Sequence, residues 1–342
     1  MKLSMPLMYS GNPREAADSV AALEKAGLDT VWVAEAYGFD SPTLLGYLAA
    51  RTETIEIASA ILNVYSRTPA LLAQTAAGLD NVSGGRAILG LGASGPQVIE
   101  GWHGLPYSKP LGRTREVVDI VRAALRREPL SSDGIFTLPL PAGQGTGLGK
   151  PLKMLTRPER SSIPIYIAAL GPQSVQATAE YADGWLPMFF APERTGLIWG
   201  EALEAGKAKR PAELAPLEIA TGGMVAIGND VKGLLDLARR AFALYIGGMG
   251  AKGKNFYNDV VSRIGFAEEA EKIQDLYLAG NKKEAEALVP VELLEMCNLV
   301  GPEAYVRERI AAFAEAGVTN LQITPATENP VALVTQMKEW LG

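Results

Sequence analysis

Eight short runs of apolar and β-branched residues alternate with amphipathic stretches, and this alternation constrains the fold more than any other feature of the sequence. Strands that alternate with helices form a parallel sheet, because each helix returns the chain to the edge where the preceding strand began. We therefore expect an α/β fold. The runs lie at residues 2–8, 30–35, 55–61, 86–92, 163–169, 183–189, 218–228 and 319–325.

The helical stretches are clearest at residues 117–125 and 310–317, where apolar side chains recur with a period of 3.6. LEKAGLDTVWV (23–33) and FAEAGVTNLQI (313–323) both run from a helical pattern through glycine into an apolar strand. Gly27 and Gly317 are therefore expected to end helices, since glycine readily adopts the left-handed conformation found there.

No composition shift or long linker divides the 342 residues, so we expect one domain over 1–342, a (β/α)8 TIM barrel, rather than two packed halves. Two segments depart from the repeat, as insertions after strands 4 and 7. Residues 129–162 are rich in Gly, Pro and Ser and are expected to form a loop, and residues 250–300 are expected to be helical. Such insertions commonly shape the active-site face of a barrel.

Composition excludes several classes of site. The net charge of −6 argues against nucleic acid and against an anionic membrane surface as partners. The chain has one cysteine, Cys297, and one histidine, His103, so no disulfide and no Cys/His zinc site is expected within it. No signal peptide and no apolar run of about 20 residues is recognised, which favours a cytoplasmic protein. A redox function would require an organic cofactor.

The stretch LGLGASGPQVIEGWHG (89–104) contains GxGxxG at Gly90, Gly92 and Gly95, the pattern of a dinucleotide-binding turn. It follows a strand, and Glu116 lies at about the distance expected of a ribose-binding carboxylate. Against this interpretation, the strand is the fourth rather than the first, and Glu116 falls inside a helix. The alternatives are a sharp turn without a ligand, or a barrel loop whose bare backbone contacts a flat ring.

This stretch, with NVYSRTPALLAQTAAGLDNVSGGR before it, resembles the luciferase-like monooxygenase superfamily, and within it the coenzyme F420-dependent oxidoreductases that include methylenetetrahydromethanopterin reductase. The resemblance continues through AGLDTVWVAEAYGFDSPTLLGYLAARTETIEIASAI, IPIYIAALGPQSVQATAEYADGWLP and GPEAYVRERIAAFAEAGV. Each motif is loose, but their order along the chain is specific.

The resemblance implies a deazaflavin site at the carboxyl ends of the strands. It implies a non-prolyl cis peptide at Ala60–Ile61 that supports the cofactor ring, an acidic residue near the ring at Glu35, and a phosphate site in AALGPQS (168–174), where backbone N–H groups begin a helix. A surface carboxylate and a plain turn are the simpler interpretations of the last two. The implied cofactor-binding residues are Ala60, Ile61, Asn63, Gly92, Ala93, Ser94, Gly95, Ala168, Ala169, Leu170, Gly171, Pro172 and Gln173.

His103 lies in a loop expected at the catalytic face, and with Glu35 it is a candidate catalytic residue, although a lone histidine is as often structural. As a general acid or base it would serve hydride transfer to or from a small organic substrate, or it would orient a substrate carbonyl. An acidic cofactor also needs cations. Candidates are Arg67, Lys109, Arg113, Arg115, Lys252 and Lys254.

We expect an oxidoreductase that uses coenzyme F420 and forms a homodimer. The first alternative is an FMN-dependent monooxygenase on the same fold, because flavin and deazaflavin differ at one ring atom. A lyase or isomerase that holds a substrate phosphate in AALGPQS, and a binding protein without turnover, are the others.

Overall fold

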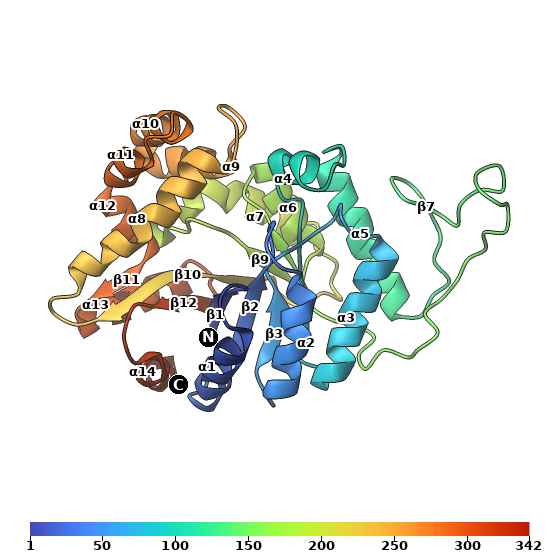
Figure 1. Cartoon of the computed structure of the whole chain (residues 1–342), viewed down its shortest axis with the longest axis horizontal. Coiled ribbons are helices and arrows are strands. Elements are labelled where there is room, and N and C mark those ends of the chain that lie inside the picture. Colours follow the sequence, from blue (N-terminus) through green and yellow to red (C-terminus); the bar gives the residue numbers. More distant parts are fainter. Residues whose placement is uncertain (342) are drawn as a thin grey trace. The chain divides into compact units, whose positions relative to one another are not determined.

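The computed structural model describes residues 1–341, and it has a strand at each of the eight predicted positions (Figure 1). The chain is an α/β protein, a (β/α)8 barrel of parallel strands, as the alternating pattern predicts. The barrel strands are β1 (Lys2–Met8), β2 (Thr30–Ala34), β3 (Glu56–Ser59), β5 (Ala87–Gly92), β8 (Ile165–Ala168), β9 (Gly184–Leu186), β10 (Glu218–Ile227) and β12 (Asn320–Pro325).

The chain divides into two compact units. The N-terminal unit comprises Leu7–Glu24 and Thr30–Ala168, and the C-terminal unit comprises Met1–Pro6, Lys25–Asp29 and Ala169–Gly342. That residues 1–342 act as one domain stays a prediction.

In the N-terminal unit, strand register brings three chain segments to one edge of the sheet. A two-residue strand, β4 (Leu62–Asn63), pairs with β5 so that Asn63 lies opposite Gly92, and β5 pairs with β8 so that Gly92 lies opposite Ala168. Parallel strands end at the same edge, so these three residues are neighbours at the carboxyl ends. The helices of this unit are α1 (Pro13–Lys25), α2 (Ser41–Arg51), α3 (Pro69–Ser83), α4 (Pro96–Gly101) and α5 (Pro110–Leu125).

Local sequence explains where α2 and α3 begin and end. Asp40 and Thr68 precede the two helices, and their side chains accept hydrogen bonds from the N–H groups of Thr43 and Leu71. A proline follows early in each first turn, where its missing N–H costs nothing. Gly84 ends α3 in the left-handed conformation, with φ of 68°.

The core of the N-terminal unit is apolar and aromatic. The rings of Trp32 and Tyr166 meet edge to face at 5.1 Å, and both side chains are buried. The helix α2 packs on β2 and β3, α3 packs on β5, and α5 packs on α3, and the side chains that these helices bury are mostly apolar.

Residues 129–162 form the predicted loop, with a small hairpin of β6 (Ser132–Asp133) and β7 (Thr137–Leu138) that sequence patterning did not indicate. Figure 1 shows the segment around β7 projecting beyond α3 and α5. The Glu116 carboxylate accepts hydrogen bonds from Ser132 Oγ at 2.6 Å, Ile135 N at 2.7 Å and Phe136 N at 3.0 Å. Glu116 therefore holds the hairpin, and the ribose-binding interpretation of this residue is wrong.

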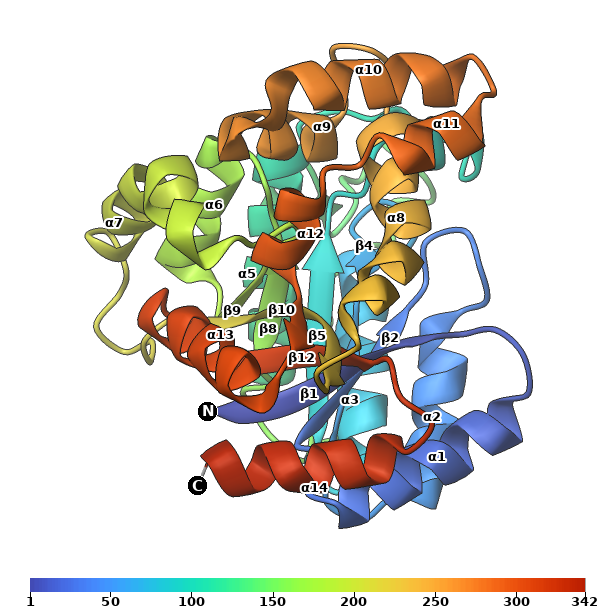
Figure 2. The same ribbon diagram turned by 90° about the vertical axis from the view of Figure 1, so that its left-hand side faces the viewer.

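In the C-terminal unit, β10 pairs with β9, β11 (Leu299–Gly301) and β12, and β12 pairs with β1. Gly27 and Gly317 follow helix ends with φ of 99° and 94°, as predicted. Figure 2 shows α13 and α14 beside β12 and β1. The helices are α6 (Pro172–Tyr181), α7 (Glu201–Lys207), α8 (Asp236–Ala243), α9 (Phe256–Val261), α10 (Ala267–Leu278), α11 (Lys282–Ala287), α12 (Val291–Cys297), α13 (Glu303–Glu315) and α14 (Pro330–Leu341).

The segment of residues 250–300 consists mainly of α9, α10, α11 and α12. In Figure 2, α10 and α11 lie above α12 and α8. Within residues 1–341, no helix has the length and apolar character needed to cross a bilayer. The same residues contain no group of three or more His, Cys, Asp or Glu side chains placed to hold a metal ion.

Candidate active site

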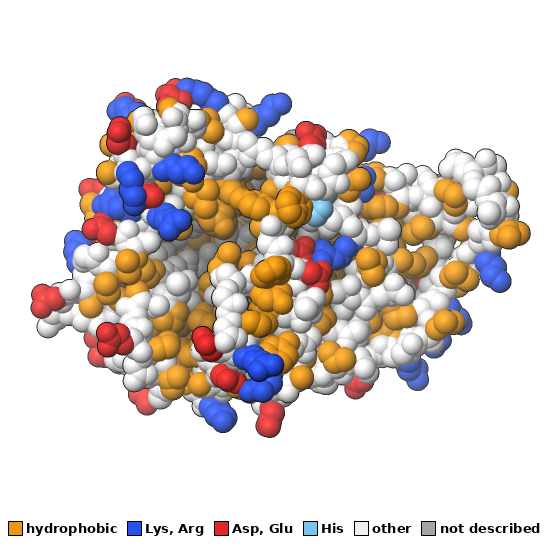
Figure 3. Space-filling model, in the orientation of Figure 1, with side chains coloured by type: hydrophobic (Ala, Val, Ile, Leu, Met, Phe, Trp, Pro, Cys, Tyr) orange, Lys and Arg blue, Asp and Glu red, His pale blue; other side chains and the backbone are white. Residues whose placement is uncertain are grey.

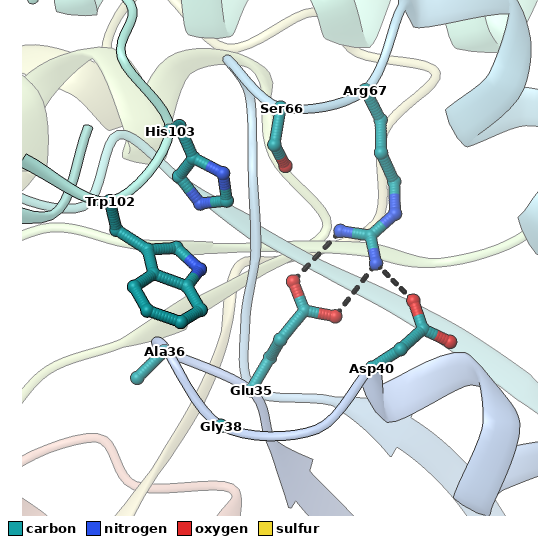
Figure 4. Close-up of a pocket in the computed structure, with 8 residues that line it drawn as sticks. All are labelled: Glu35, Ala36, Gly38, Asp40, Ser66, Arg67, Trp102 and His103. Carbon is teal, nitrogen blue, oxygen red and sulfur yellow. Dashed lines mark hydrogen bonds and ion pairs between the residues drawn. The ribbon is translucent and has the colours of Figure 1, made fainter. Parts of the chain in front are cut away.

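A pocket of about 270 Å³ opens in the N-terminal unit where β2, the turn after β4 and the loop after α4 meet. Figure 4 shows His103 and Trp102 on one side of the pocket and Arg67 on the other, with Glu35 and Asp40 below. The pale blue imidazole reaches the surface next to hydrophobic side chains (Figure 3). The lining residues are Glu35, Ala36, Gly38, Asp40, Ser66, Arg67, Trp102 and His103.

Glu35 follows β2 and forms a two-pronged ion pair with Arg67. Its Oε1 and Oε2 lie 2.8 Å from Nη1 and Nη2 of Arg67, and Oε2 also accepts a hydrogen bond from Ser41 N at 3.0 Å. The two side chains are 8% and 14% exposed, so the pair is shielded from solvent. Asp40 contacts the same guanidinium through Nη2 at 2.5 Å.

These contacts determine the charge of the pocket. Burial acts against ionisation of Arg67, but the hydrogen bonds and the attraction of Glu35, and then those of Asp40, outweigh it. Burial also acts against ionisation of Asp40, and there the hydrogen bond from Thr43 and the contact with Arg67 outweigh it. The pKa of Arg67 is therefore raised and the pKa of Asp40 is lowered. Two carboxylates around one guanidinium leave this side of the pocket with a net charge of about −1 at neutral pH.

His103 follows α4 and contacts Asn63, which lies 40 residues earlier at the end of β4. The amide Nδ2 of Asn63 is 3.2 Å from the imidazole Nε2. Asn63 is 4% exposed, and its Oδ1 accepts hydrogen bonds from Tyr65 N at 3.0 Å and Ser66 N at 2.7 Å. The turn after β4 thus fixes one side of the imidazole.

Close packing explains two glycines of GLGASG. A Cβ atom on Gly90 would lie 1.8 Å from the Ser59 carbonyl oxygen, and one on Gly92 would lie 3.1 Å from Ile61. The peptide between Ala60 and Ile61 is cis, as the resemblance implied. Gly95 precedes the six-residue α4, and a Cβ on Gly95 would meet no atom within 4 Å. These glycines shape a barrel loop and begin no long Rossmann helix.

An aromatic group supports the turn after β5. Tyr107 donates a hydrogen bond to the Ser94 carbonyl at 3.3 Å, stacks on Tyr65 at 5.4 Å, and burial raises its pKa to about 12. The Arg113 guanidinium lies 4.7 Å from the Tyr65 ring and 4.9 Å from the Phe136 ring. Tyr107 therefore stays protonated at neutral pH and holds Ser94, whose φ is 57°.

The segment 169–173 lies in the C-terminal unit, where it leads into α6. Two indoles hold it: Trp185 Nε1 donates to the Ala169 carbonyl at 2.8 Å, and Trp199 Nε1 donates to the Leu170 carbonyl at 2.7 Å. Gly171 precedes the helix without a side-chain cap, and Pro172 occupies the first turn. Backbone N–H groups of the first turn are the donors that an anion binds at a helix start.

The predicted site residues fall into two sets. Residues 35, 60, 61, 63, 92–95, 103 and 168 belong to the N-terminal unit, and residues 169–173 belong to the C-terminal unit. Of the candidate cations, Arg67 lines the pocket, whereas Lys252 pairs at the surface with Asp275.

Asp40, Ser66 and Trp102 line the pocket and were missed as site residues. The sequence pointed to Trp102 as a site residue only through its position next to His103. Tyr107, Trp185 and Trp199 support loops of the site through hydrogen bonds that no sequence pattern indicates.

Residues 2–320 match the family model of the luciferase-like monooxygenases. A Mycobacterium tuberculosis protein named as a coenzyme F420-dependent oxidoreductase is 41% identical over 97% of each chain. The 5,10-methylenetetrahydromethanopterin reductase of Archaeoglobus fulgidus is 30% identical over 88% of this chain and 86% of its own. The solved coenzyme F420-dependent tetrahydromethanopterin reductase of Methanopyrus kandleri superposes with a TM-score of 0.81 over 99% of both chains at 22% identity. The chain belongs to the luciferase-like monooxygenase family.

Proposed function

We propose that the protein is an oxidoreductase that transfers a hydride between coenzyme F420 and a small organic substrate. The observation that carries this proposal is the similarity to coenzyme F420-dependent relatives along nearly the whole chain. Family membership also removes the support for a lyase or isomerase that holds a substrate phosphate in residues 168–174.

Two observations fit a deazaflavin with a phosphate-bearing side chain. After β5, Ala93 and Ser94 have small side chains and a Cβ on Gly95 would meet nothing within 4 Å, which leaves room for a flat ring. At the start of α6, a Cβ on Gly171 would have only Ser174 Oγ near it, at 3.7 Å, so the approach to the helix N-terminus is open. We assign the ring-binding role to residues 60, 61, 63, 92–95 and 168, and the phosphate-binding role to residues 169–173.

The cofactor, when bound, supplies the hydride or accepts it. The chain binds and orients the reactants around it. His103 presents an imidazole to the pocket, and the exposed Trp102 indole offers an apolar surface beside it. Glu35 holds Arg67 in place through both carboxylate oxygens, so its catalytic role stays a prediction and its contacts point to positioning.

The net negative charge around Arg67 bears on the substrate. An anionic substrate would meet Glu35 and Asp40 without a free cation among the residues that line the pocket. The lining therefore favours a neutral or cationic polar molecule. FMN stays the alternative cofactor, because a Baeyer-Villiger monooxygenase of the same fold, 19% identical to this chain, was solved in complex with FMN.

Separate titrations with oxidised coenzyme F420 and with FMN, followed by fluorescence, test the proposal. We expect saturable binding of F420 at micromolar or lower concentration and at least about 100-fold weaker binding of FMN, which corresponds to nearly 3 kcal/mol. Tighter binding of FMN would overturn the proposal in favour of a flavin monooxygenase. If neither cofactor bound, the proposed hydride transfer would be rejected.

We also propose that the protein is a cytoplasmic homodimer. The single cysteine, Cys297, is buried, so the fold uses no disulfide of the kind that oxidising compartments favour. Leu71 and Val82 of α3 are exposed, and exposed apolar side chains of this kind are what a second copy covers. Light scattering at micromolar concentration tests the assembly, and a monomer mass would reject it.

A further inference from the structure

The hydrogen bonds of Asn63 determine which atom of its amide faces His103. Tyr65 N and Ser66 N both donate to Oδ1, at 3.0 and 2.7 Å. If the amide were turned over, its NH2 group would face two N–H donors at hydrogen-bonding distance, which is unfavourable. Oδ1 is therefore fixed toward the backbone, and Nδ2 is the atom that faces the imidazole, 3.2 Å from Nε2.

An amide nitrogen only donates, so Nε2 must be the acceptor of this hydrogen bond. A neutral imidazole with a free lone pair on Nε2 carries its hydrogen on Nδ1. Among residues 1–341, Nδ1 has no hydrogen-bond partner, and His103 lines the pocket. The buried Ser66 hydroxyl, which lines the same pocket, also lacks a partner among these residues.

We propose that Asn63 is a positioning residue that fixes His103 as the Nδ1–H tautomer, so that the pocket presents an N–H donor to an acceptor atom of the substrate. A hydrogen on Nε2 would face the amide hydrogens of Asn63, so Nε2 stays an acceptor and the imidazole offers the N–H of Nδ1 to the pocket. The substrate class that matches is a carbonyl or imine, whose oxygen or nitrogen accepts the hydrogen bond at Nδ1. The tautomer stands without the proposed function, whereas the substrate class rests on it.

The chain has a single histidine, so protein labelled with 15N-histidine and freed of any tag gives one imidazole in a long-range 1H–15N spectrum. Near pH 8 we expect a pyridine-type Nε2 and a protonated Nδ1. A spectrum with hydrogen on Nε2 would overturn the proposal, and this measurement needs no variant.

The variant N63D replaces the amide donor that faces His103 Nε2 with a carboxylate oxygen, which is an acceptor. Its carboxylate still accepts from Tyr65 N and Ser66 N, but the other oxygen faces Nε2 and calls for a hydrogen there. We expect the tautomer to switch to Nε2–H, or the ring to become doubly protonated. N329D is the matched control, because Asn329 is exposed and its Oδ1 also accepts a backbone hydrogen bond, from Ala332 N at 3.1 Å. An unchanged imidazole spectrum in folded N63D would overturn the proposal.

A kinetic measurement tests the substrate part separately. At saturating coenzyme F420, N63D should lower kcat for reduction of a carbonyl or imine substrate on the order of 100-fold, and N329D should not change it. Equal kcat in N63D and N329D would overturn the donor role. Failure of every form to bind F420 would reject the proposed function and leave the tautomer result standing.

Discussion

The hydroxyl of Ser59 joins β3 to β5 through both backbone groups of Gly90. It accepts a hydrogen bond from Gly90 N and donates one to the Gly90 carbonyl, each at 2.9 Å. The Ser59 carbonyl oxygen lies where a Cβ on Gly90 would be, so only glycine fits at this position.

Replacement of Gly90 by alanine should therefore destabilise the protein by more than about 4 kcal/mol, since neither strand can move away from the other without loss of these bonds. The denaturant midpoint, followed by circular dichroism, measures the effect. Gly78→Ala is the control: a Cβ there meets nothing within 4 Å, and the substitution within α3 should stabilise by roughly 0.5–1 kcal/mol. Similar midpoints for the two variants would contradict the packing argument.

Glu35→Gln should cost about 3 kcal/mol of unfolding free energy, near the lower limit for a broken buried pair, because Asp40 still faces Arg67. A double-mutant cycle with Arg67→Gln isolates the interaction. We expect the double variant to be less destabilised than the sum of the single variants. Strict additivity would mean that the two side chains contribute independently.

His103→Ala should lower turnover by at least about 100-fold and leave the dissociation constant of the cofactor nearly unchanged, because the imidazole serves the reacting substrate. Steady-state kinetics and a fluorescence titration on the same preparation give both values. A structural histidine would show the reverse: near-normal kcat with a lowered unfolding midpoint.

Gly171→Val tests the phosphate role of the loop before α6. The backbone accepts a Cβ there, since φ is −71° and the nearest atom is 3.7 Å away, so the fold should tolerate the change. The added methyl groups block a ligand's approach to the helix N-terminus, and the cofactor dissociation constant should rise by about tenfold or more. Gly46→Val in α2, where a built Cβ has no neighbour within 4 Å, is the control. Unchanged affinity would remove the phosphate assignment.

The pH dependence of stability should include Cys297. Burial raises the pKa of its thiol from 9.0 to about 12. The charge of Arg309 opposes this rise, and the charge of Glu193 adds to it. The unfolded chain loses this proton at lower pH than the folded protein, so the contribution is complete below about pH 9 and declines as pH rises toward 12. At pH 8 the native thiol should not react with a thiol reagent until denaturant is added. Rapid reaction of the native protein would contradict the burial.

The fold was largely predictable because the barrel strands are apolar runs with turn residues between them. All eight were located: the bounds of β1 were predicted as they are, and the ends of the other strands differ from the prediction by at most three residues. β4 was missed because two residues give no periodic pattern, and β11 because the three-residue run Leu299–Gly301 begins only one residue after α12.

The site was less predictable, because its contacts join residues far apart in the chain. Arg67 was considered only as a cofactor-binding cation, yet it pairs with Glu35, 32 residues earlier. Asn63 and His103 were each identified as site residues, but no pattern in one sequence shows that they touch. These contacts depend on the register of β4 against β5 and on the course of the loops that follow them, which a single sequence does not specify.

The projecting segment around β7 has a practical consequence for handling the protein. Lys150 and Lys153 are exposed and lie outside any helix or strand, so trypsin has access to them. Further along the chain, Arg160 forms an ion pair with the buried Asp80 and donates a hydrogen bond to the Ala87 carbonyl. The strand β8 also remains paired with β5. A single nick in this segment should therefore yield two fragments that co-purify as one particle, and the segment is a suitable place to insert a fluorophore-binding tag.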